Sequence, residues 1–483
     1  MQLSTVQRIL GLFLTLFSLT LLPSLGIAWW TDDGALSAFT SAFLLTLGIG
    51  LVLWLPVRTH KRELRVRDGF VVVVLFWAGL GLTGSIPFAL AENIHMSLSD
   101  AVFESISGLT TTGATVMAGI DELPPSILFY RQQLQWLGGL GIIVLAVAIL
   151  PMLGIGGMQL YRAETPGPLK DAKLTPRITE TAKALWYIYL TMTIICAAAY
   201  WMAGMSTFDA IAHSFSTVAI GGFSTHDLSI GYFNNPWIEI IAVIFMLLAG
   251  INFALHFLAW RSLSVGPYRT DSEFKTYLVL LGAVCVISCA YLIYSGTYDG
   301  FAETLRQGIF QSVAIATTTG FTTTEFQAWP SFLPVMLLFA SFGGACAGST
   351  GGGLKVIRVL LLFKQGLREI KRLIHPNAII PIKIGGRPLP DRIMDAVWGF
   401  FATYVFAFTI LLLLLMATGL DQVTAFSAMA ACMNNLGPGL GDVSANYGSI
   451  SNTAKWILMF AMVLGRLEIF TLLVLMTPAF WRK

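Results

Sequence analysis

The chain alternates long apolar stretches with short polar connections. Nine stretches of at least 20 residues carry no Lys, Arg, Asp or Glu, and a tenth of similar length contains Arg466 and Glu468. An α-helix needs about 20 apolar residues to cross the ~30 Å hydrocarbon core of a bilayer. The pattern predicts ten spans: Ile9–Thr31, Gly34–Val57, Gly69–Ala91, Gln132–Tyr161, Ala184–Phe208, Ile240–Trp260, Thr276–Tyr298, Ala328–Leu354, Ala396–Leu420 and Lys455–Pro478.

Composition favours a membrane protein over a soluble or disordered one. Of 483 residues, 56% are hydrophobic and 11% are charged, whereas soluble domains carry about 25% charged residues. The five cysteines lie in apolar stretches without CxxC spacing, so neither a disulfide framework nor a zinc site is predicted. The first span could also be a signal peptide, but it is longer than a usual apolar h-region and no A-x-A site follows it.

Basic residues in the connections predict the orientation of the spans. They cluster at Arg58–Arg67, Arg162–Lys183, Arg261–Lys275 and Lys355–Arg392. Lys and Arg are retained on the cytoplasmic side of a membrane. Both termini are therefore expected in the cytoplasm, which requires an even number of spans. Of the 29 Lys and Arg residues, those that fall outside this assignment are Arg131, Arg306, Lys455 and Arg466.

Four short segments between the spans align on a glycine without gaps. They are DAVFESISGLTTTG (Asp100–Gly113), DAIAHSFSTVAIGG (Asp209–Gly222), QGIFQSVAIATTTG (Gln307–Gly320) and TAFSAMAACMNNLG (Thr424–Gly437). In each, about ten helix-compatible residues precede a loop. Asp100 and Asp209 are well placed to cap the first two short helices, whereas Asp299 and Asp421 lie further upstream in the other two.

This repetition predicts the domain organisation. Self-similar segments at a fixed spacing indicate repeated structural units. We expect an all-α polytopic membrane protein with two N-terminal spans (1–67) and four pseudo-fourfold repeats of span, pore helix, filter loop and span around one pore. The repeats cover 68–160, 161–262, 263–372 and 373–483, and the third also contains an intramembrane glycine-rich loop.

The loops at the aligned glycines contain no charged residue. A cation that leaves water needs oxygen ligands, which such loops offer as backbone carbonyls and Thr hydroxyls. Rings of carbonyls are the K⁺-channel solution to replacing a hydration shell, and irregular backbone at membrane depth is tolerated where it lines water. The alternative is that Thr and Gly only allow close helix packing, an interpretation that four loops in matching register make weaker.

With these motifs the chain resembles the Trk/Ktr/HKT superfamily of K⁺ transporters over essentially its whole length, and most closely the membrane subunit of bacterial Trk potassium uptake. The segments HSFSTVAIGGFSTHD, GGACAGSTGGGLKVIRVLLLFKQ, NNLGPGLG and GRLEIFTLLVLMTP carry the resemblance. In that family a glycine at all four filter positions accompanies K⁺ preference, and a serine in the first repeat accompanies Na⁺ permeation. The glycines here are Gly113, Gly222, Gly320 and Gly437.

The resemblance also implies which residues bind K⁺. By motif position, the ion-lining residues beside the four glycines are Thr111, Thr112, Ile220, Gly221, Thr318, Thr319, Asn435 and Leu436. The fourth loop departs most from a K⁺-channel pattern, so selectivity is expected to be less strict than in a symmetric K⁺ channel.

A glycine-rich segment after the third filter, SFGGACAGSTGGGLK (Ser341–Lys355), predicts a break in a span. Each glycine destabilises a helix interior by about 1 kcal/mol relative to alanine. The alternatives are a phosphate loop, which lacks the GK[ST] motif here, and a helix-packing surface. We expect an intramembrane loop that obstructs the pore, and the resemblance implies the same. The expected gate residues are Gly343, Gly344, Gly348, Ser349, Thr350, Gly351, Gly352 and Gly353.

Arg466 lies within the last span, where a charge usually faces a cavity or a partner. It could pair with Glu468 or a carbonyl, although residues two apart point to different faces of a helix. We favour a position at the pore below the filter, where the charge raises the barrier to cations. The matching arginine of the family has that position, so Arg466 joins the expected gate.

The resemblance further implies partners: a homodimer in the lipid bilayer of the bacterial inner membrane, and a cytoplasmic nucleotide-binding regulatory subunit (TrkA-like). The chain has no nucleotide motif, so we expect no cofactor of its own, no nucleic-acid partner and no enzymatic activity, with K⁺ as the transported ion. The basic segment Lys364–Arg392 is either a docking surface or ordinary cytoplasmic sequence. Rival functions are a less selective K⁺/Na⁺ channel and a proton-coupled K⁺ transporter with broken helices. An intramembrane enzyme is disfavoured because His213 and His256 form no catalytic constellation.

Overall fold

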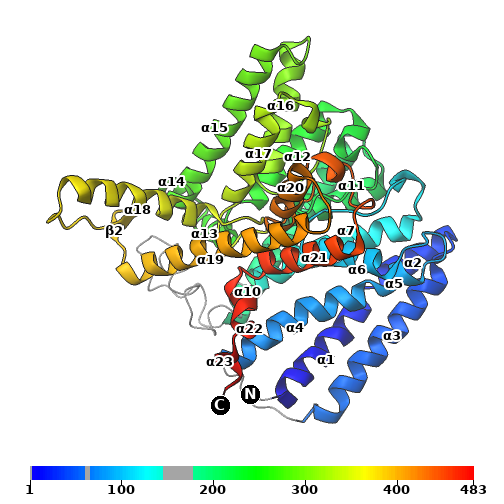
Figure 1. The fold of residues 1–483 in the computed structure, drawn as a ribbon. Helices are drawn as coiled ribbons and strands as arrows, with labels where there is room; N and C mark the ends of the chain where they lie inside the picture. The colour runs from blue at the N-terminus through cyan, green and yellow to red at the C-terminus, as the bar shows by residue number, and fades with distance from the viewer. Residues whose placement is uncertain (1–2, 60–65, 145–177, 483) are drawn as a thin grey trace.

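Helices make up nearly all the regular structure in the computed structural model, which describes residues 3–59, 66–144 and 178–482 (Figure 1). The first part of the chain contains α1 (Leu3–Leu19), α2 (Leu22–Thr31), α3 (Leu36–Trp54), η1 (Leu55–Val57), α4 (Val66–Gly84), α5 (Ile86–Leu90), α6 (Leu98–Leu109), η2 (Ile120–Glu122) and α7 (Pro125–Val144). The next part contains α10 (Ile178–Met202), α11 (Thr207–Ala219), η5 (Ser229–Phe233), α12 (Pro236–Ala249), α13 (Phe253–Ser262) and α14 (Gly266–Thr270).

The second half of the chain continues the pattern. It contains α15 (Ser272–Ser295), α16 (Phe301–Ala316), η6 (Phe326–Ala328), α17 (Phe332–Gly343), α18 (Val356–Ile374), α19 (Asp391–Met416), α20 (Gln422–Met433), η7 (Gly441–Val443), α21 (Asn452–Arg466), α22 (Phe470–Met476) and α23 (Pro478–Trp481). One hairpin of two-residue strands, β1 (Lys383–Ile384) and β2 (Arg387–Pro388), pairs Lys383 with Pro388. The predicted all-α architecture is confirmed apart from this hairpin.

Among the described residues, six helical segments are long and apolar enough to cross a membrane, or up to eight if each of two bent helix pairs is one span. The predicted count of ten is therefore not confirmed. The fourth predicted span, Gln132–Tyr161, is described only as far as Val144, and most of the basic cluster Arg162–Lys183 also lies outside the described residues.

Two predicted spans are bent rather than straight. Helices α12 and α13 meet at 92°, because the chain turns after Gly250 and the Asn252 side chain caps α13 by accepting from the Ala254 amide at 2.8 Å. Helices α21 and α22 meet at 116°, and both Glu468 and Ile469 have positive φ at that bend.

Four short helices, α6, α11, α16 and α20, coincide with the predicted pore helices and are largely buried. The predicted caps were wrong for α6 and α11, because Ser97 and Ser206 occupy the cap positions and accept from the amides of Asp100 and Asp209. The carboxylates of Asp100 and Asp209 instead accept hydrogen bonds from these serine hydroxyls, at 2.7 Å in both helices. Asp421 caps α20 directly, and α16 starts after Gly300 without a side-chain cap.

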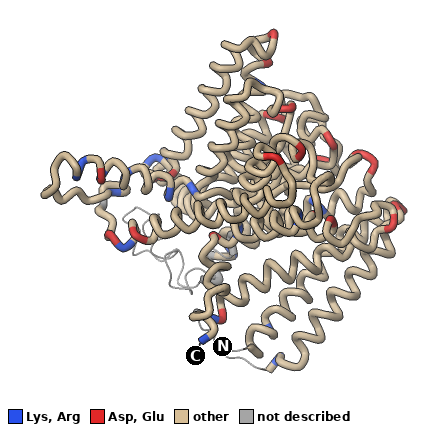
Figure 2. The backbone as a smooth tube through the Cα atoms, in the orientation of Figure 1, with Lys and Arg blue, Asp and Glu red and all other residues tan. Residues whose placement is uncertain are grey.

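The two ends of the described chain lie close together (Figure 1). Arg67 donates to the Arg482 carbonyl at 2.9 Å, and the rings of Phe70 and Phe480 are in contact. Basic residues gather on the projecting arm around α18, with some acidic residues among them, and further acidic residues lie at helix ends far from the termini (Figure 2).

Candidate ion pathway

All four short helices end in the same hydrogen-bonded turn. The residue two positions before each aligned glycine has positive φ. The residue that immediately precedes the glycine donates its amide to the carbonyl of the residue five positions before itself. The φ values are 53° at Thr111, 54° at Ile220, 67° at Thr318 and 54° at Asn435. The closing bonds are Thr112 to Ser107 (2.9 Å), Gly221 to Ser216 (2.8 Å), Thr319 to Ala314 (2.8 Å) and Leu436 to Ala431 (2.7 Å).

This turn is a Schellman motif, which usually has glycine at its left-handed position. Threonine and isoleucine are β-branched, and their Cβ substituents crowd the backbone at positive φ. Such conformations cost on the order of 1–3 kcal/mol each and persist where the surroundings over-determine them, often at functional sites. No glycine marks these left-handed positions, so the sequence pattern does not predict the turn.

The four aligned glycines form a closed ring of contacts. Each has positive φ, from 79° at Gly113 to 97° at Gly437. A Cβ on any of them would lie less than 3.0 Å from the carbonyl oxygen that precedes the glycine of the next repeat. The pairs are Gly113 with Gly221, Gly222 with Thr319, Gly320 with Leu436, and Gly437 with Thr112. The fourth loop thus returns to the first, and the four loops surround one axis.

Several side chains of the loops are held by neighbouring protein groups, whereas Thr111 Oγ1 is buried without a hydrogen-bond partner among the described residues. The hydroxyls of Thr112 and Thr319 lie 2.7 Å and 2.8 Å from those of Thr110 and Thr317. Asn435 Nδ2 also donates to Thr112 Oγ1 at 2.9 Å. These hydroxyls are therefore already in hydrogen bonds, which leaves the backbone carbonyls as the main oxygen groups of the ring.

A vestibule of about 490 Å³ lies on one side of the ring. Residues that follow the aligned glycine in all four repeats line it, including Thr115, Ser224, Thr323 and Asn446. Arg131 reaches its wall, where the guanidinium Nε lies 2.8 Å from Glu104 Oε1 and Nη1 donates to the Ser224 carbonyl at 3.0 Å. The ion pair lies within the first repeat, and the hydrogen bond to Ser224 joins that repeat to the second.

His226 in the vestibule bridges two carboxylates. Its Nδ1 lies 2.5 Å from Asp121 Oδ1 and its Nε2 lies 3.4 Å from Asp209 Oδ1, while its ring stacks on Tyr232 at 3.5 Å. Burial opposes protonation of His226, but hydrogen bonding to the two carboxylates outweighs it and raises the pKa of His226. Burial likewise opposes ionisation of Asp121 and Asp209, and hydrogen bonds, chiefly from His226, outweigh it and lower the pKa of both.

We expect His226→Gln to lower thermal stability more at pH 6 than at pH 9. A raised histidine pKa gives a contribution that is fully present below the unfolded value of about 6.5 and is lost as pH rises through the folded value. The lowered pKa of the carboxylates keeps them charged throughout this window. Melting temperatures of the purified protein at both pH values measure the effect. His375→Gln, at an exposed histidine after α18, is the control. An equal loss for His226→Gln at both pH values would contradict a stabilising charged bridge between Asp121 and Asp209.

The glycine-rich segment leaves the helix where the sequence predicts. Helix α17 ends at Gly343, and the chain is not helical again until α18 starts at Val356. The Gly352 amide donates to Thr318 Oγ1 at 2.7 Å and the Gly353 amide to the Asn434 carbonyl at 3.0 Å. The loop therefore lies against residues that precede the ring glycines, whereas the vestibule is lined by residues that follow them.

The remaining residues of this loop pack on elements around it. Gly344 has φ 62° and faces the Gly352 carbonyl, and the Gly348 carbonyl accepts from the Phe253 amide at 3.1 Å. Ser349 Oγ donates to the Cys346 carbonyl at 2.6 Å. Thr350 Oγ1 donates to the Val218 carbonyl at 3.0 Å. The Gly351 carbonyl accepts from Lys355 Nζ.

Glu273 at the start of α15 links the first half of the loop to the first turn of α18. Its Oε1 accepts from the Ala347 amide at 2.7 Å and the Ile357 amide at 3.3 Å, and the side chain is buried. The sequence pattern does not predict this role, because an acidic residue at the start of a span is usually interfacial.

Arg466 joins this loop to helix α7. Its Nη1 donates to the Thr350 carbonyl at 2.9 Å and its Nη2 to the Gly138 carbonyl at 3.2 Å. It does not pair with Glu468, which instead binds Arg358 Nη2 at 2.6 Å. Of the alternatives from the sequence, the carbonyl partners are the ones observed.

A cavity of about 20 Å³ lies beside Arg466, on the side of the ring that faces the glycine-rich loop. It has room for about one water molecule. Gly351–Gly353, Asn435, Lys355 and Arg358 also line it. Glu468 lines it too, so three basic side chains and one carboxylate surround it. This space is much smaller than the vestibule on the other side of the ring.

Comparison with known proteins relates the chain to one family over almost its whole length. A family model described as TrkH, cation transport protein, matches residues 35–483. The chain is 58% identical over 489 residues to the Trk system potassium uptake protein TrkH of Vibrio parahaemolyticus, with 100% of both covered. It is 40% identical over 478 residues to the Trk system potassium uptake protein TrkG of Escherichia coli K12, covering 99% of this chain and 98% of that protein.

A solved structure shows the same fold. The crystal structure of the potassium transporter TrkH from Vibrio parahaemolyticus matches with a TM-score of 0.93 and 55% identity, covering 100% of both chains. The fold of an all-α polytopic membrane protein is thereby confirmed.

Proposed function

The chain belongs to the TrkH family of cation transport proteins, and from this premise we propose that it takes up K⁺ across the bacterial inner membrane through the ring of four loops. The observation that carries the proposal is the closed ring of glycine–carbonyl contacts. The relatives named as potassium uptake proteins support K⁺ as the ion.

In this proposal the ring is the selectivity filter. Carbonyl oxygens replace the hydration shell of the ion, and the C-terminal ends of α6, α11, α16 and α20 add negative potential at the same place. The filter residues are Thr111, Thr112, Gly113, Ile220, Gly221, Gly222, Thr318, Thr319, Gly320, Asn435, Leu436 and Gly437. The predicted units 68–160, 161–262, 263–372 and 373–483 each supply one quarter of it.

The glycine-rich loop and Arg466 form the gate in this proposal. The hydrogen bonds of the Gly352 amide and of Arg466 hold the loop beneath the ring, and the arginine charge opposes cations there. The gate comprises Gly343, Gly344, Gly348, Ser349, Thr350, Gly351, Gly352, Gly353 and Arg466. The small cavity beside Arg466 supports a closed resting state.

A cytoplasmic nucleotide-binding subunit is proposed to open this gate, with two copies of the chain in the assembly and both termini in the cytoplasm. The surface that supports docking is on α18, where Phe363, Ile370 and Leu373 are 66%, 58% and 84% exposed beside Lys and Arg residues. Exposed apolar residues of this density mark interaction surfaces. The projecting position of α18 leaves them accessible (Figure 1).

Reversal potentials in proteoliposomes that contain the purified chain test the proposed function. With K⁺ and Na⁺ gradients in opposite directions, we expect the reversal potential to follow the K⁺ gradient. Empty liposomes are the control. Equal responses to both gradients would instead support a less selective K⁺/Na⁺ channel, and a shift with an imposed pH gradient would support proton coupling.

A further inference from the structure

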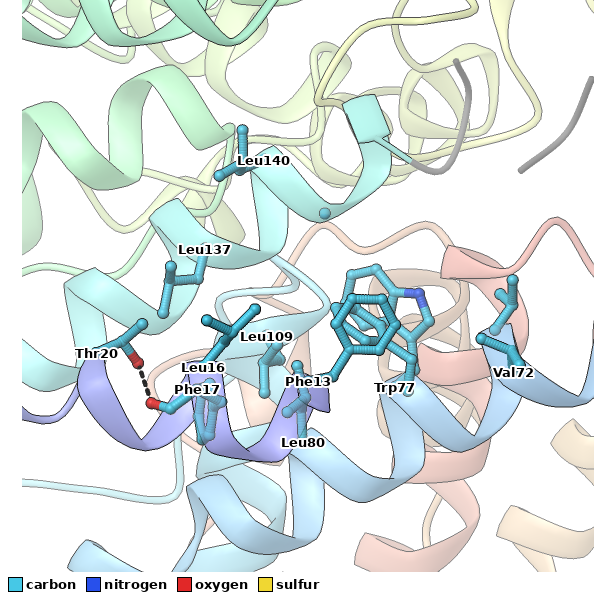
Figure 3. Close-up of a pocket in the computed structure, with 13 residues that line it drawn as sticks. Phe13, Leu16, Phe17, Thr20, Val72, Trp77, Leu80, Leu109, Leu137 and Leu140 are labelled. Carbon is cyan, nitrogen blue, oxygen red and sulfur yellow. Dashed lines mark hydrogen bonds between the residues drawn. The ribbon is translucent and has the colours of Figure 1, made fainter. Parts of the chain in front are cut away.

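An apolar cavity of about 240 Å³ lies between α1, α4 and α7, outside the ion pathway (Figure 3). Aromatic and aliphatic side chains form its walls, among them Phe13, Leu16, Trp77 and Leu137. None of its described lining residues carries a charge. The hydroxyl of Thr20 at its edge donates to the Phe17 carbonyl at 2.7 Å and offers no free donor to the cavity.

The surroundings of the cavity determine what can fill it. Helices α1 and α4 belong to membrane-spanning segments, and Leu16 at the cavity is 51% exposed on the outside of the chain. Empty apolar cavities exclude water, and one of about 150 Å³ admits benzene. In a bilayer, the abundant apolar solute of matching chemistry is a lipid acyl chain.

One wall of the cavity is shared with the proposed filter and gate. Leu109, the last residue of α6, lines it and immediately precedes the first filter loop. Leu137 and Gly141, which also line the cavity, lie one residue before and three residues after Gly138, whose carbonyl accepts from Arg466. A Cβ on Gly138 would overlap the Leu109 carbonyl, so the backbones of α7 and of the end of α6 are in direct contact.

Trp77 separates the cavity from Arg466. Its side chain is 2% exposed, and its ring centroid lies 5.8 Å from the Arg466 guanidinium carbon. Cation–π attraction extends to about 6 Å, so this contact is at the limit of its range. A small displacement of the indole into an empty cavity would therefore break it.

We propose that this cavity binds one acyl chain of a bilayer phospholipid, and that the bound chain braces Trp77 and α7 so that Arg466 stays in its closed position. The proposed binding of the acyl chain depends only on the cavity. The proposed effect on flux depends also on the gate that is part of the proposed function.

Photolabelling tests the binding site. Proteoliposomes doped with a phosphatidylcholine that carries a diazirine on its acyl chain are irradiated, and the adducts are mapped by mass spectrometry. We expect adducts on residues of the cavity wall, such as Leu16 and Leu137. No adduct there would overturn the site. A diazirine fatty acid that labels the wall when the phospholipid does not would overturn the phospholipid as occupant.

Gly141→Leu provides the matched variant. A Cβ at Gly141 meets Trp77 and Phe76 only at 3.5–3.8 Å, ordinary contact distances, so the larger side chain can extend into the cavity. The adducts should disappear in this variant and persist in Gly282→Leu, where a Cβ meets nothing within 4 Å. If Gly141→Leu does not fold, Leu16→Trp at the exposed edge serves in its place. Unchanged labelling in the filled variant would overturn the site.

Resting K⁺ flux tests the coupling. In liposomes whose acyl chains carry methyl branches, which fit the cavity poorly, we expect the wild type and Gly282→Leu to conduct about threefold more than in straight-chain lipid. Gly141→Leu should conduct equally in both. The same ratio in all three proteins would overturn the coupling and leave the labelling result intact. A failure of the gate itself would be recognised separately, as unchanged flux in Arg466→Ala.

Discussion

Arg466→Ala is expected to raise the resting K⁺ flux of the purified protein by at least about tenfold, because each ~1.4 kcal/mol removed from the closed state is tenfold in its population. The substitution removes two hydrogen bonds from a charged donor, to Thr350 and Gly138, each worth about 1.5–3 kcal/mol. It also removes the charge beside the small cavity. Flux into proteoliposomes without any regulatory subunit measures the change.

Arg466→Lys separates the two contributions. Lysine keeps the positive charge but lacks the planar fork that lets arginine reach two carbonyls at once. High flux in this variant would assign closure to the bonds, and low flux would assign it to the charge. Arg306→Ala is the matched control, since Arg306 is also paired, with Glu239 at 2.6 Å, but lies away from the gate. If Arg466→Ala leaves flux at the wild-type level while the protein folds normally, Arg466 is not part of the gate.

Arg466→Ala is a sharper test of the gate than a shortening of Gly348–Gly353 would be. The amides of Gly352 and Gly353 also bind Thr318 and Asn434. A deletion would therefore disturb the ring as well as the loop, and its effect on flux would have two causes.

Gly113→Ser is expected to lower the K⁺/Na⁺ permeability ratio by about tenfold, equivalent to ~1.4 kcal/mol of discrimination. The Cβ of serine would overlap the Gly221 carbonyl oxygen, and the backbone at Gly113 has φ 79°. Gly221 O is also held by Gln135 Nε2 at 2.6 Å, so its displacement would disturb a fixed ligand geometry. Reversal potentials under paired K⁺ and Na⁺ gradients give the ratio.

Gly119→Ser distinguishes loss of ring geometry from strain alone. Gly119 also has positive φ, 66°, but a Cβ there meets nothing within 4 Å. We expect this variant to keep the wild-type ratio. Loss of selectivity in both variants would point to general strain in the first repeat, and retention in both would remove Gly113 from the filter.

The sequence predicted the features that depend on local pattern. The lengths of the apolar stretches predicted helices such as α10, α15 and α19. An uninterrupted apolar stretch of this length crosses a bilayer as an α-helix, because only then are its backbone groups hydrogen-bonded within the segment. The density of glycines predicted the end of α17 at Gly343. The alignment on glycine located the four short helices and the positive φ at the ring.

Other features depend on contacts that no local pattern encodes. The left-handed residues Thr111, Ile220 and Thr318 carry no glycine signal, since the Schellman turn is imposed on them by packing. The partners of Arg466 lie 116 and 328 residues away. At the bend between α21 and α22, Glu468 pairs with Arg358, 110 residues away in the sequence, which composition could not reveal.

The closed ring has a consequence for how each molecule is made. Gly437 in the last quarter of the chain contacts Thr112 in the first. At about 5–20 residues per second, synthesis of the intervening chain takes roughly tens of seconds. Throughout that time the ring has an open side, whatever the first three quarters have achieved in the membrane. A polypeptide that terminates before Gly437 therefore lacks a complete ring, and translation of the final quarter is a condition for closing it.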